Sequence, residues 1–243
     1  MIKKLVSTTL FLSLLLHPMS FLSGEKIVEG GLKEETLSDD KKKNESENET
    51  FISEVNTLYI EMHLESVVSF DAFEKAITGY NKLHSKNKSI FTIIDYSKAS
   101  TEERLCVIDM SKKKLLYKSH VSHGRNSGDN YARYFSNKYG SYKSSLGFYR
   151  TGNTYLGNNG YSLVLNGLEY GINHNAKARS IVMHGADYCD PSLARSGSRL
   201  GRSLGCPALP HDLTKPIINK IKGGTLIFVY AKDKTYLQKS NII

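Results

Sequence analysis

Apolar residues recur at helical spacing in one early segment of the chain. Six of them fall where one face of a helix would carry them: Val68, Phe70, Phe73, Ala76, Ile77 and Tyr80. Ser69 precedes most of this set, and its hydroxyl suits it to cap the first turn of a helix. The pattern predicts a helix over about 70–83, inside an N-terminal helical segment of about 60–85.

Short runs rich in Ile, Val and Tyr predict strands in the rest of the chain. These runs are 90–96, 104–110, 115–122, 161–165, 180–184 and 225–230. Residues 111–114 would join the second and third runs as a hairpin, and residues 124–161, rich in Gly, Ser, Asn and Tyr, predict either a long loop or short strands with functional turns. A short helix around 213–222 would end at Gly223-Gly224. This order predicts an α+β fold, mostly β, with a few short helices.

The first 50 residues differ from the rest. Lys3 and Lys4 precede an apolar run from Leu5 to Leu16, which predicts a signal peptide over 1–23; an uncleaved anchor is the alternative, although a membrane span needs ~20 apolar residues. Residues 24–50 hold nine acidic residues, five lysines and no aromatic residue, which predicts a disordered charged spacer. The folded domain is then expected over 51–243, exported to the periplasm or cell envelope.

Charge narrows the classes of partner. The chain has 243 residues, a net charge of +9 and three cysteines. Residues 24–50 carry a net charge of −4, and Lys3 and Lys4 carry +2. The remaining residues, 51–243, therefore carry +11, a charge that suits binding to an anionic polymer. The chain shows no nucleic-acid recognition motif, so we expect no nucleic-acid partner. Three cysteines are too few, and odd in number, for a disulfide scaffold.

Two residues have the chemistry of a nucleophile and its base. His184 follows the predicted strand 180–183, and Cys206 lies in the Gly-containing turn 203–207. A neighbouring imidazole activates a thiol by lowering its pKa or taking its proton. Glycine beside the cysteine would let a carbonyl approach the sulfur and let backbone N–H groups face an oxyanion. A buried structural cysteine with an unrelated surface histidine is the alternative that spacing alone leaves open.

These two blocks resemble a known family. Residues 180–185 (SIVMHG) and 201–207 (GRSLGCP) are similar to the murein L,D-transpeptidase catalytic domain, also called YkuD-like, whose signature is His-Gly followed by Ser-His-Gly-Cys. The resemblance extends through 122–128, 144–149 and 167–171 and covers roughly 90–231. It implies an exported β-sandwich or barrel enzyme that remodels peptidoglycan through an acyl-cysteine, with no cofactor or metal.

The resemblance also implies roles for four residues. Cys206 would be the nucleophile and His184 its proton partner. The carbonyl of Gly185 would orient the imidazole, and the N–H groups of Gly205 and Cys206 would contribute to the oxyanion site.

The chain departs from the family pattern at two positions beside the nucleophile. Leu204 stands where the family has histidine, and Ala208 stands where it has arginine. Arg199, Arg202 and His123 are the candidates to replace those side chains. Guanidinium groups pair bidentately with carboxylates, which peptidoglycan stem peptides carry, although a solvated basic loop is the plainer interpretation.

Two further residues are predicted to contact substrate. Ser203 belongs to the turn of the nucleophile, and Tyr149 belongs to a tyrosine-rich stretch over 131–170 that is expected to line a groove for a glycopeptide. Cys106 lies in an apolar strand and is expected to be a core residue. Cys189 lies in a turn, and whether it pairs with Cys206 as a disulfide stays open.

The predicted function is a cysteine-dependent peptidoglycan L,D-transpeptidase that acts on stem tetrapeptides and is peripheral to the cell wall. The acyl acceptor is left open between a second stem, a protein, a free D-amino acid and water, and a monomer is assumed. One alternative is a zinc peptidase or amidase, whose ligands would come from His184, Asp187, Cys189 and either His174 or His211. Another is a non-catalytic wall-binding protein held by its charge.

Overall fold

The computed structural model describes residues 32–85, 87–196 and 198–243. The predicted signal peptide, 1–23, and residues 24–31 of the predicted spacer lie outside the described residues. No helix within the described ranges is long and apolar enough to cross a membrane.

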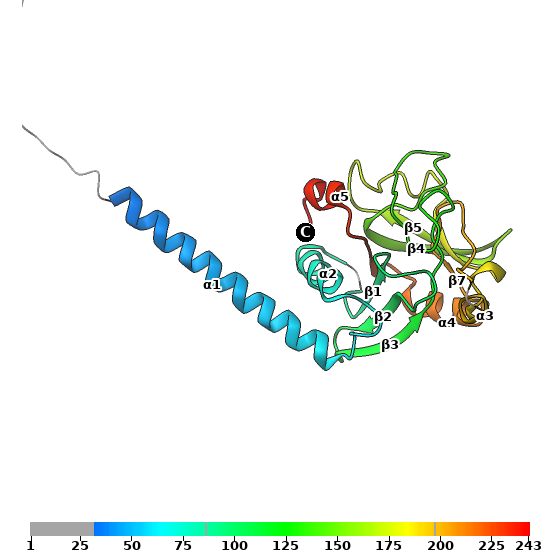
Figure 1. Ribbon diagram of the computed structural model, residues 1–243, viewed down its shortest axis with the longest axis horizontal. Helices are drawn as coiled ribbons and strands as arrows, with labels where there is room; N and C mark the ends of the chain where they lie inside the picture. Colours follow the sequence, from blue (N-terminus) through cyan, green and yellow to red (C-terminus); the bar gives the residue numbers. More distant parts are fainter. Residues whose placement is uncertain (1–31, 86, 197) are drawn as a thin grey trace, which may run out of the picture. The chain divides into compact units, whose positions relative to one another are not determined.

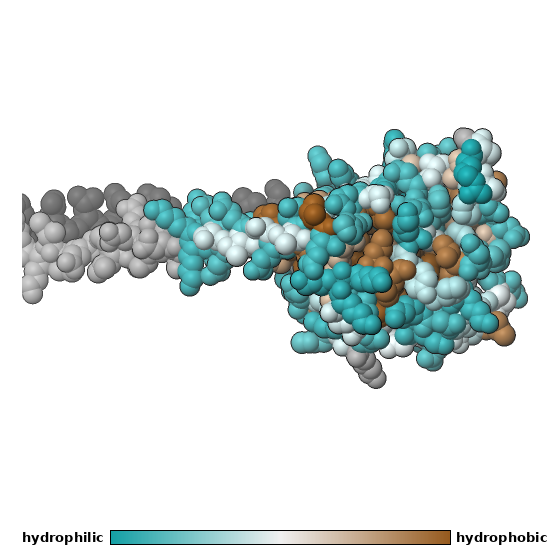
Figure 2. Space-filling model, turned by 90° about the horizontal axis from the view of Figure 1, so that it is seen from below, coloured by the Kyte–Doolittle hydropathy of each residue, from teal (hydrophilic) through white to brown (hydrophobic). Residues whose placement is uncertain are grey.

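Helix α1 spans Leu32–Glu61, so residues 32–50 are helical where the sequence analysis expected a disordered spacer. Residues 41–50 are exposed, and the hydrophilic colours of α1 in Figure 2 agree with their composition. Lys and Glu are good helix formers, which lets a polar segment continue a helix whose other end is packed. That end carries an apolar stripe that packs on the core through Phe51, Val55, Leu58 and Tyr59. The domain boundary near residue 51 stays a prediction.

Eight strands form one sheet in the order β3-β2-β1-β8-β4-β5-β6-β7, which curves toward a barrel (Figure 1). The pairs β1–β8 and β6–β7 are parallel, and the other neighbouring strands are antiparallel. The strands are β1 (Ile90–Asp95), β2 (Leu105–Asp109), β3 (Lys114–Ser119), β4 (Gly147–Gly157), β5 (Gly160–Gly167), β6 (Val182–Gly185), β7 (Ala208–Leu209) and β8 (Leu226–Tyr230). The predicted α+β, mostly-β fold is confirmed.

Two amphipathic helices cover parts of the sheet. Helix α2 (Phe70–Lys82) begins directly after Ser69, whose hydroxyl accepts a hydrogen bond from the Ala72 N–H, and it packs against β1 and β8. Helix α4 (His211–Ile221) packs against β1, β5 and β6. The three shorter helices are η1 (Asp187–Cys189), α3 (Pro191–Arg195) and α5 (Lys234–Lys239). Both helices predicted from periodicity, 70–83 and 213–222, are confirmed to within two residues.

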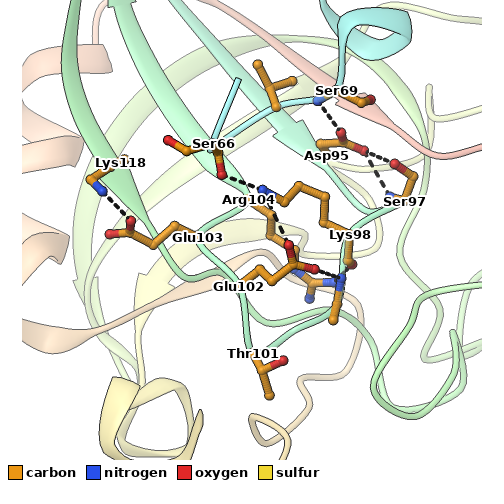
Figure 3. A network of polar contacts seen from close by, with 12 residues as sticks. Ser66, Ser69, Asp95, Ser97, Lys98, Thr101, Glu102, Glu103, Arg104 and Lys118 are labelled. Carbon is orange, nitrogen blue, oxygen red and sulfur yellow. Dashed lines mark hydrogen bonds and ion pairs between the residues drawn. The ribbon is translucent and has the colours of Figure 1, made fainter. Parts of the chain in front are cut away.

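A polar network ties α2 to the end of β1 (Figure 3). The Asp95 carboxylate accepts hydrogen bonds from the backbone N–H of Ser69, at 2.9 Å, and of Ser97, at 3.0 Å. Lys98 Nζ donates to the Ser66 carbonyl at 2.6 Å. The contact with Ser69 satisfies a backbone N–H at the start of α2, where four N–H groups have no partner within the helix.

Residues 124–161, for which the sequence left two interpretations open, divide at Gly147. Residues 133–146 have no helix or strand, and β4 begins at Gly147. Gly147 has φ +96°, and a Cβ there would lie 2.2 Å from a carboxylate oxygen of Glu169. Because that carboxylate also accepts the Phe148 N–H at 2.7 Å, it fixes the point at which the long loop enters the sheet.

Candidate active site

The predicted nucleophile and base belong to the segments that pair at the β6–β7 end of the sheet. In the parallel pair β6–β7, His184 lies opposite Ala208, and Cys206 stands two residues before Ala208. The Val182 N–H points at the Cys206 Sγ, 3.5 Å away. Val182 is two residues before His184, and alternate residues of a strand lie about 7 Å apart, so the thiol lies one such step along β6 from the histidine.

The His184 ring is held by its own strand. Its Nδ1 lies 2.9 Å from the Gly185 carbonyl oxygen, which can only accept, so Nδ1 carries the proton and Nε2 is left to accept one. Burial lowers the pKa of His184; the hydrogen bond to Gly185 opposes this effect, and the charge of His211 adds to it. The side chain is therefore a neutral base at pH 7. This contact is the one expected for Gly185.

The Cys206 thiol is nearly enclosed, with 9% of the residue exposed. Its Sγ lies 3.7 Å from the Ser180 carbonyl oxygen. Burial raises the pKa of the thiol, while the Val182 N–H and the charge of Arg179 oppose this rise. The resting pair is thus a thiol and a neutral imidazole rather than a thiolate and an imidazolium.

The turn before the nucleophile is fixed by Ser203. Its hydroxyl donates to the Cys206 carbonyl at 2.7 Å and accepts the Gly205 N–H at 3.0 Å. The Gly205 N–H, expected to face an oxyanion, is therefore already engaged within the turn. The Cys206 N–H has no acceptor among the described residues, so it is the better placed of the two predicted donors.

A cavity of about 480 Å³ adjoins the base. His184 and Gly185 form part of its wall, with Tyr188 beside them and His211 across from Gly185. A Cβ on Gly185 would lie 2.7 Å from His211 Nδ1, so this approach requires glycine. His211 Nε2 in turn lies 3.0 Å from Asp187. The cavity gives a substrate access to the imidazole side of the pair.

Arg179 is a site residue that the sequence analysis missed. Its Nη2 donates to the Lys143 carbonyl at 2.6 Å and lies 3.4 Å from where a Cβ on Gly205 would be. It stands five residues before His184 in a turn without periodicity, so its place next to the nucleophile had no signal in spacing. A basic residue immediately before the strand that leads to His184 was the single available hint.

The sequence matches the L,D-transpeptidase catalytic domain (YkuD_2) over residues 64–230. The chain belongs to this L,D-transpeptidase catalytic domain family. The match covers more than half of the chain and includes both His184 and Cys206.

Solved structures show the same kind of similarity. An L,D-transpeptidase from Mycobacterium smegmatis is 14% identical with a TM-score of 0.37, over 59% of this chain and 59% of that chain. An L,D-transpeptidase from Mycobacterium tuberculosis H37Rv is 13% identical with a TM-score of 0.37, over 59% of this chain and 58% of that chain. The helical cell shape determining protein Pgp2 from Campylobacter jejuni is 16% identical with a TM-score of 0.41, over 66% of this chain and 56% of that chain. The chain thus spans less than two thirds of these proteins. No curated protein matches it.

The two positions predicted to depart from the L,D-transpeptidase motif have different environments. Leu204, at the family's histidine position, is 57% exposed beside the nucleophile turn. Ala208, at the family's arginine position, is fully buried in β7. A side chain at 208 would therefore be enclosed in this chain, and any cation near Cys206 must come from another segment.

Arg199 and Arg202 have partners inside the chain. Arg199 Nε pairs with Asp129, and its Nη1 donates to the Leu200 carbonyl at 2.9 Å. Arg202 Nη1 donates to the Gly128 carbonyl at 2.9 Å and lies 3.5 Å from Asp129. Both guanidinium groups thus hold the loop around residues 125–129, and their role in substrate binding stays a prediction.

His123 and Tyr149 are buried. The Nδ1 of His123 accepts from Arg104 at 2.9 Å, and burial together with the charge of Arg104 lowers its pKa to about 3. The Tyr149 hydroxyl donates to the Ser145 carbonyl at 2.9 Å, and burial raises its pKa. Neither side chain is exposed to a groove, so their predicted contacts with substrate stay predictions.

All three cysteines are free thiols. Cys106 is fully buried in β2, as predicted. Cys189 Sγ donates to the Ala208 carbonyl at 3.1 Å. Cys189 is a free thiol in this structure and forms no disulfide with Cys206. Within residues 32–85, 87–196 and 198–243, no three His, Cys, Asp or Glu side chains are grouped to hold a metal, so the zinc alternative finds no ligand set there.

Proposed function

We propose that this L,D-transpeptidase family member is an exported enzyme of peptidoglycan that uses Cys206 as its nucleophile. The proposal is supported by the match to the catalytic domain family and, above all, by the pairing of His184 in β6 with Ala208, two residues after Cys206. The basic charge of the folded part suits the anionic cell wall.

In the first half-reaction, the thiol attacks the carbonyl carbon that precedes the terminal D-residue of a stem tetrapeptide. The thiol proton passes to His184 Nε2, and the C–S bond forms as the Cys206 N–H donates to the oxyanion. The imidazolium then gives that proton to the leaving amine. The C–N bond breaks, and the D-amino acid leaves as the thioester is formed.

In the second half-reaction, an amine of a second stem attacks the thioester. His184 takes a proton from this amine, the new amide C–N bond forms, and the C–S bond breaks to return the thiol. Water in place of the amine gives carboxypeptidase activity, and a free D-amino acid gives exchange. The cavity next to His184 is where we place this acceptor, because the acceptor must reach the base.

The resting protonation states support general-base catalysis. Burial raises the pKa of Cys206 and lowers that of His184, so each group is neutral before substrate binds. A neutral imidazole is ready to accept a proton. The proton therefore moves during attack, when the substrate carbonyl has reached the thiol.

The test is incubation of purified protein with disaccharide-tetrapeptide, with products identified by mass spectrometry. Wild type should release the terminal D-residue and form cross-linked dimers, and Cys206→Ala should form neither, while both have the same circular dichroism spectrum. Cys189→Ala is the matched control, because it removes another buried thiol near β7 and should keep turnover within about threefold of wild type.

Three results would contradict this proposal. Equal products from wild type and Cys206→Ala would exclude the thiol as nucleophile. Binding of peptidoglycan by wild type without any turnover would instead favour the wall-binding alternative. Loss of activity on chelation together with resistance to alkylation would favour the zinc alternative.

A further inference from the structure

Arg179 reaches the nucleophile from a turn between β5 and β6. Its N–H donates to the Asn175 carbonyl at 2.8 Å, and the next residue, Ser180, has φ +56°. Ser180 has a left-handed backbone conformation, and it ends the turn that precedes β6. Arg179 and the Ser180 carbonyl therefore belong to the same turn. The same Ser180 carbonyl lies 3.7 Å from the Cys206 Sγ.

The guanidinium group is fixed by four hydrogen bonds. Nη1 donates to the Ser136 carbonyl at 2.6 Å and to the Ser145 hydroxyl at 2.5 Å. Nη2 donates to the Ser141 hydroxyl at 3.2 Å and to the Lys143 carbonyl at 2.6 Å. All four N–H groups of the fork are thus engaged, which leaves none for bidentate binding of a substrate carboxylate.

The acceptors of these bonds are all neutral. No carboxylate pairs with Arg179 among the described residues, and its Nε is buried without a partner there. A cation held by carbonyl and hydroxyl groups keeps its full charge, and because Arg179 is half-buried, solvent screens that charge only in part. Burial lowers the pKa of Arg179, but an arginine remains protonated near pH 7.

Arg179 adjoins the turn that carries the Cys206 thiol. Nη2 lies 3.4 Å from the position of a Cβ on Gly205, which has φ +126° and precedes the nucleophile. The other titratable groups around the thiol are His184, Tyr188 and Tyr96. The raised pKa values of the two phenols and the lowered pKa of the imidazole leave all three uncharged at pH 7.

We propose that Arg179 is a positioning residue whose fixed positive charge stabilises the Cys206 thiolate as it forms. It would supply, from the turn before β6, a cation where the arginine of the family motif is replaced by the buried Ala208. The inference rests on the proposed function only in making Cys206 the nucleophile. The reactivity of the thiol itself can be measured without any peptidoglycan substrate.

The test is the rate of alkylation of Cys206 by iodoacetamide between pH 6 and 10, with the modified residue located by mass spectrometry. Arg179→Gln should react about tenfold more slowly than wild type at pH 7, because its thiol deprotonates at higher pH. The two rates should approach each other only as the pH rises past the pKa of the thiol, so wild type should gain rate at lower pH than Arg179→Gln. Arg179→Lys should stay within about threefold of wild type, because it keeps the charge while losing hydrogen bonds to the loop.

Arg150→Gln is the matched control. Arg150 also has a buried Nε without a partner, but its Nη2 donates to the His84 carbonyl, on another part of the fold. This variant should alkylate like wild type at every pH. A general loosening of the protein would instead speed alkylation in both glutamine variants.

Three outcomes would overturn the inference: an unchanged pH profile in Arg179→Gln, faster alkylation of that variant at pH 7, or a lysine variant as slow as the glutamine variant. If Arg179→Gln does not fold, the lysine variant decides alone, since charge without the hydrogen-bonded fork should preserve the rate. Wild type that shows the expected alkylation profile but no turnover of tetrapeptide would contradict the proposed function and leave this inference standing.

Discussion

Two buried cysteines of this chain, Cys106 and Cys206, lie in environments that act differently on the pKa of a thiol. Cys106 sits in β2, between β1 and β3, where it is fully buried, and burial raises its pKa to about 12. Cys206 sits at the β6–β7 edge, where the Val182 N–H and the charge of Arg179 oppose the rise that burial causes. Burial alone therefore does not separate an inert thiol from a candidate nucleophile.

The difference lies in which polar groups face the sulfur. The central strands use their backbone N–H groups for pairing, so few are left for a side chain. At the β6 edge, β7 is two residues long, and the chain before it is free to turn. The Val182 N–H then points at Sγ instead of at another carbonyl. Because β7 is short, a backbone N–H of β6 is left free to donate to a side chain, which the central strands do not allow.

The largest expected effect tests the base of this pair. His184→Gln should lower tetrapeptide turnover about a thousandfold, because it removes the imidazole Nε2 that accepts the thiol proton in the proposed mechanism. Turnover should be measured by mass spectrometry at several pH values. His174→Gln, which changes an exposed histidine, is the control and should be unaffected. A turnover loss of less than tenfold in His184→Gln would show that the thiol at the edge works without its neighbour.

The fold class could be predicted, and the candidate pair of His184 and Cys206 could be proposed, because both depend on local pattern. The run 180–183 followed by His184, and the turn around Cys206, carry signals within a few residues. Strand pairing then brings them together, and the register that does so was not available from the sequence. The engaged Gly205 N–H shows the limit of this reasoning, since a hydroxyl two residues away competes for the donor.

Arg179 and α1 could not be predicted for different reasons. The position of Arg179 depends on contacts with residues 136–145, more than 30 residues away, and no periodicity marks such a contact. The α1 segment has a composition typical of disorder, and its apolar stripe begins at Phe51, after the charged run that dominated the interpretation. Long-range contacts and one packed helix end therefore account for these differences.

A smaller effect separates the two cysteines by stability. Cys106→Ser should lower the free energy of unfolding by about 2 kcal/mol, because a hydroxyl replaces a weakly polar group at a fully buried position. Cys206→Ser should cost less than about 1 kcal/mol, since polar groups already face that position. Urea denaturation of both variants and wild type measures the difference. Equal costs would mean that the two environments do not differ in polarity as the contacts indicate.

The smallest effect extends the comparison to histidines, with His123 in the interior and His184 at the edge. Burial and the charge of Arg104 lower the pKa of His123 to about 3, against an ordinary value of 6.5. Between these values the unfolded chain binds a proton at His123 and the folded chain does not, so stability should fall as pH falls from 6.5. The slope from this group is at most about 1.4 kcal/mol per pH unit.

Urea denaturation at pH 6.5, 5.5 and 4.5 measures this slope for wild type and His123→Gln. Other titrating groups contribute equally to both proteins, so the difference between the two slopes isolates His123. Glutamine keeps an acceptor for Arg104 and cannot gain a proton, so the variant should have the shallower slope. Equal slopes for the two proteins would mean that His123 is protonated in the folded chain, beside the buried Arg104. The environment of His123 in the interior would then not exclude a second positive charge.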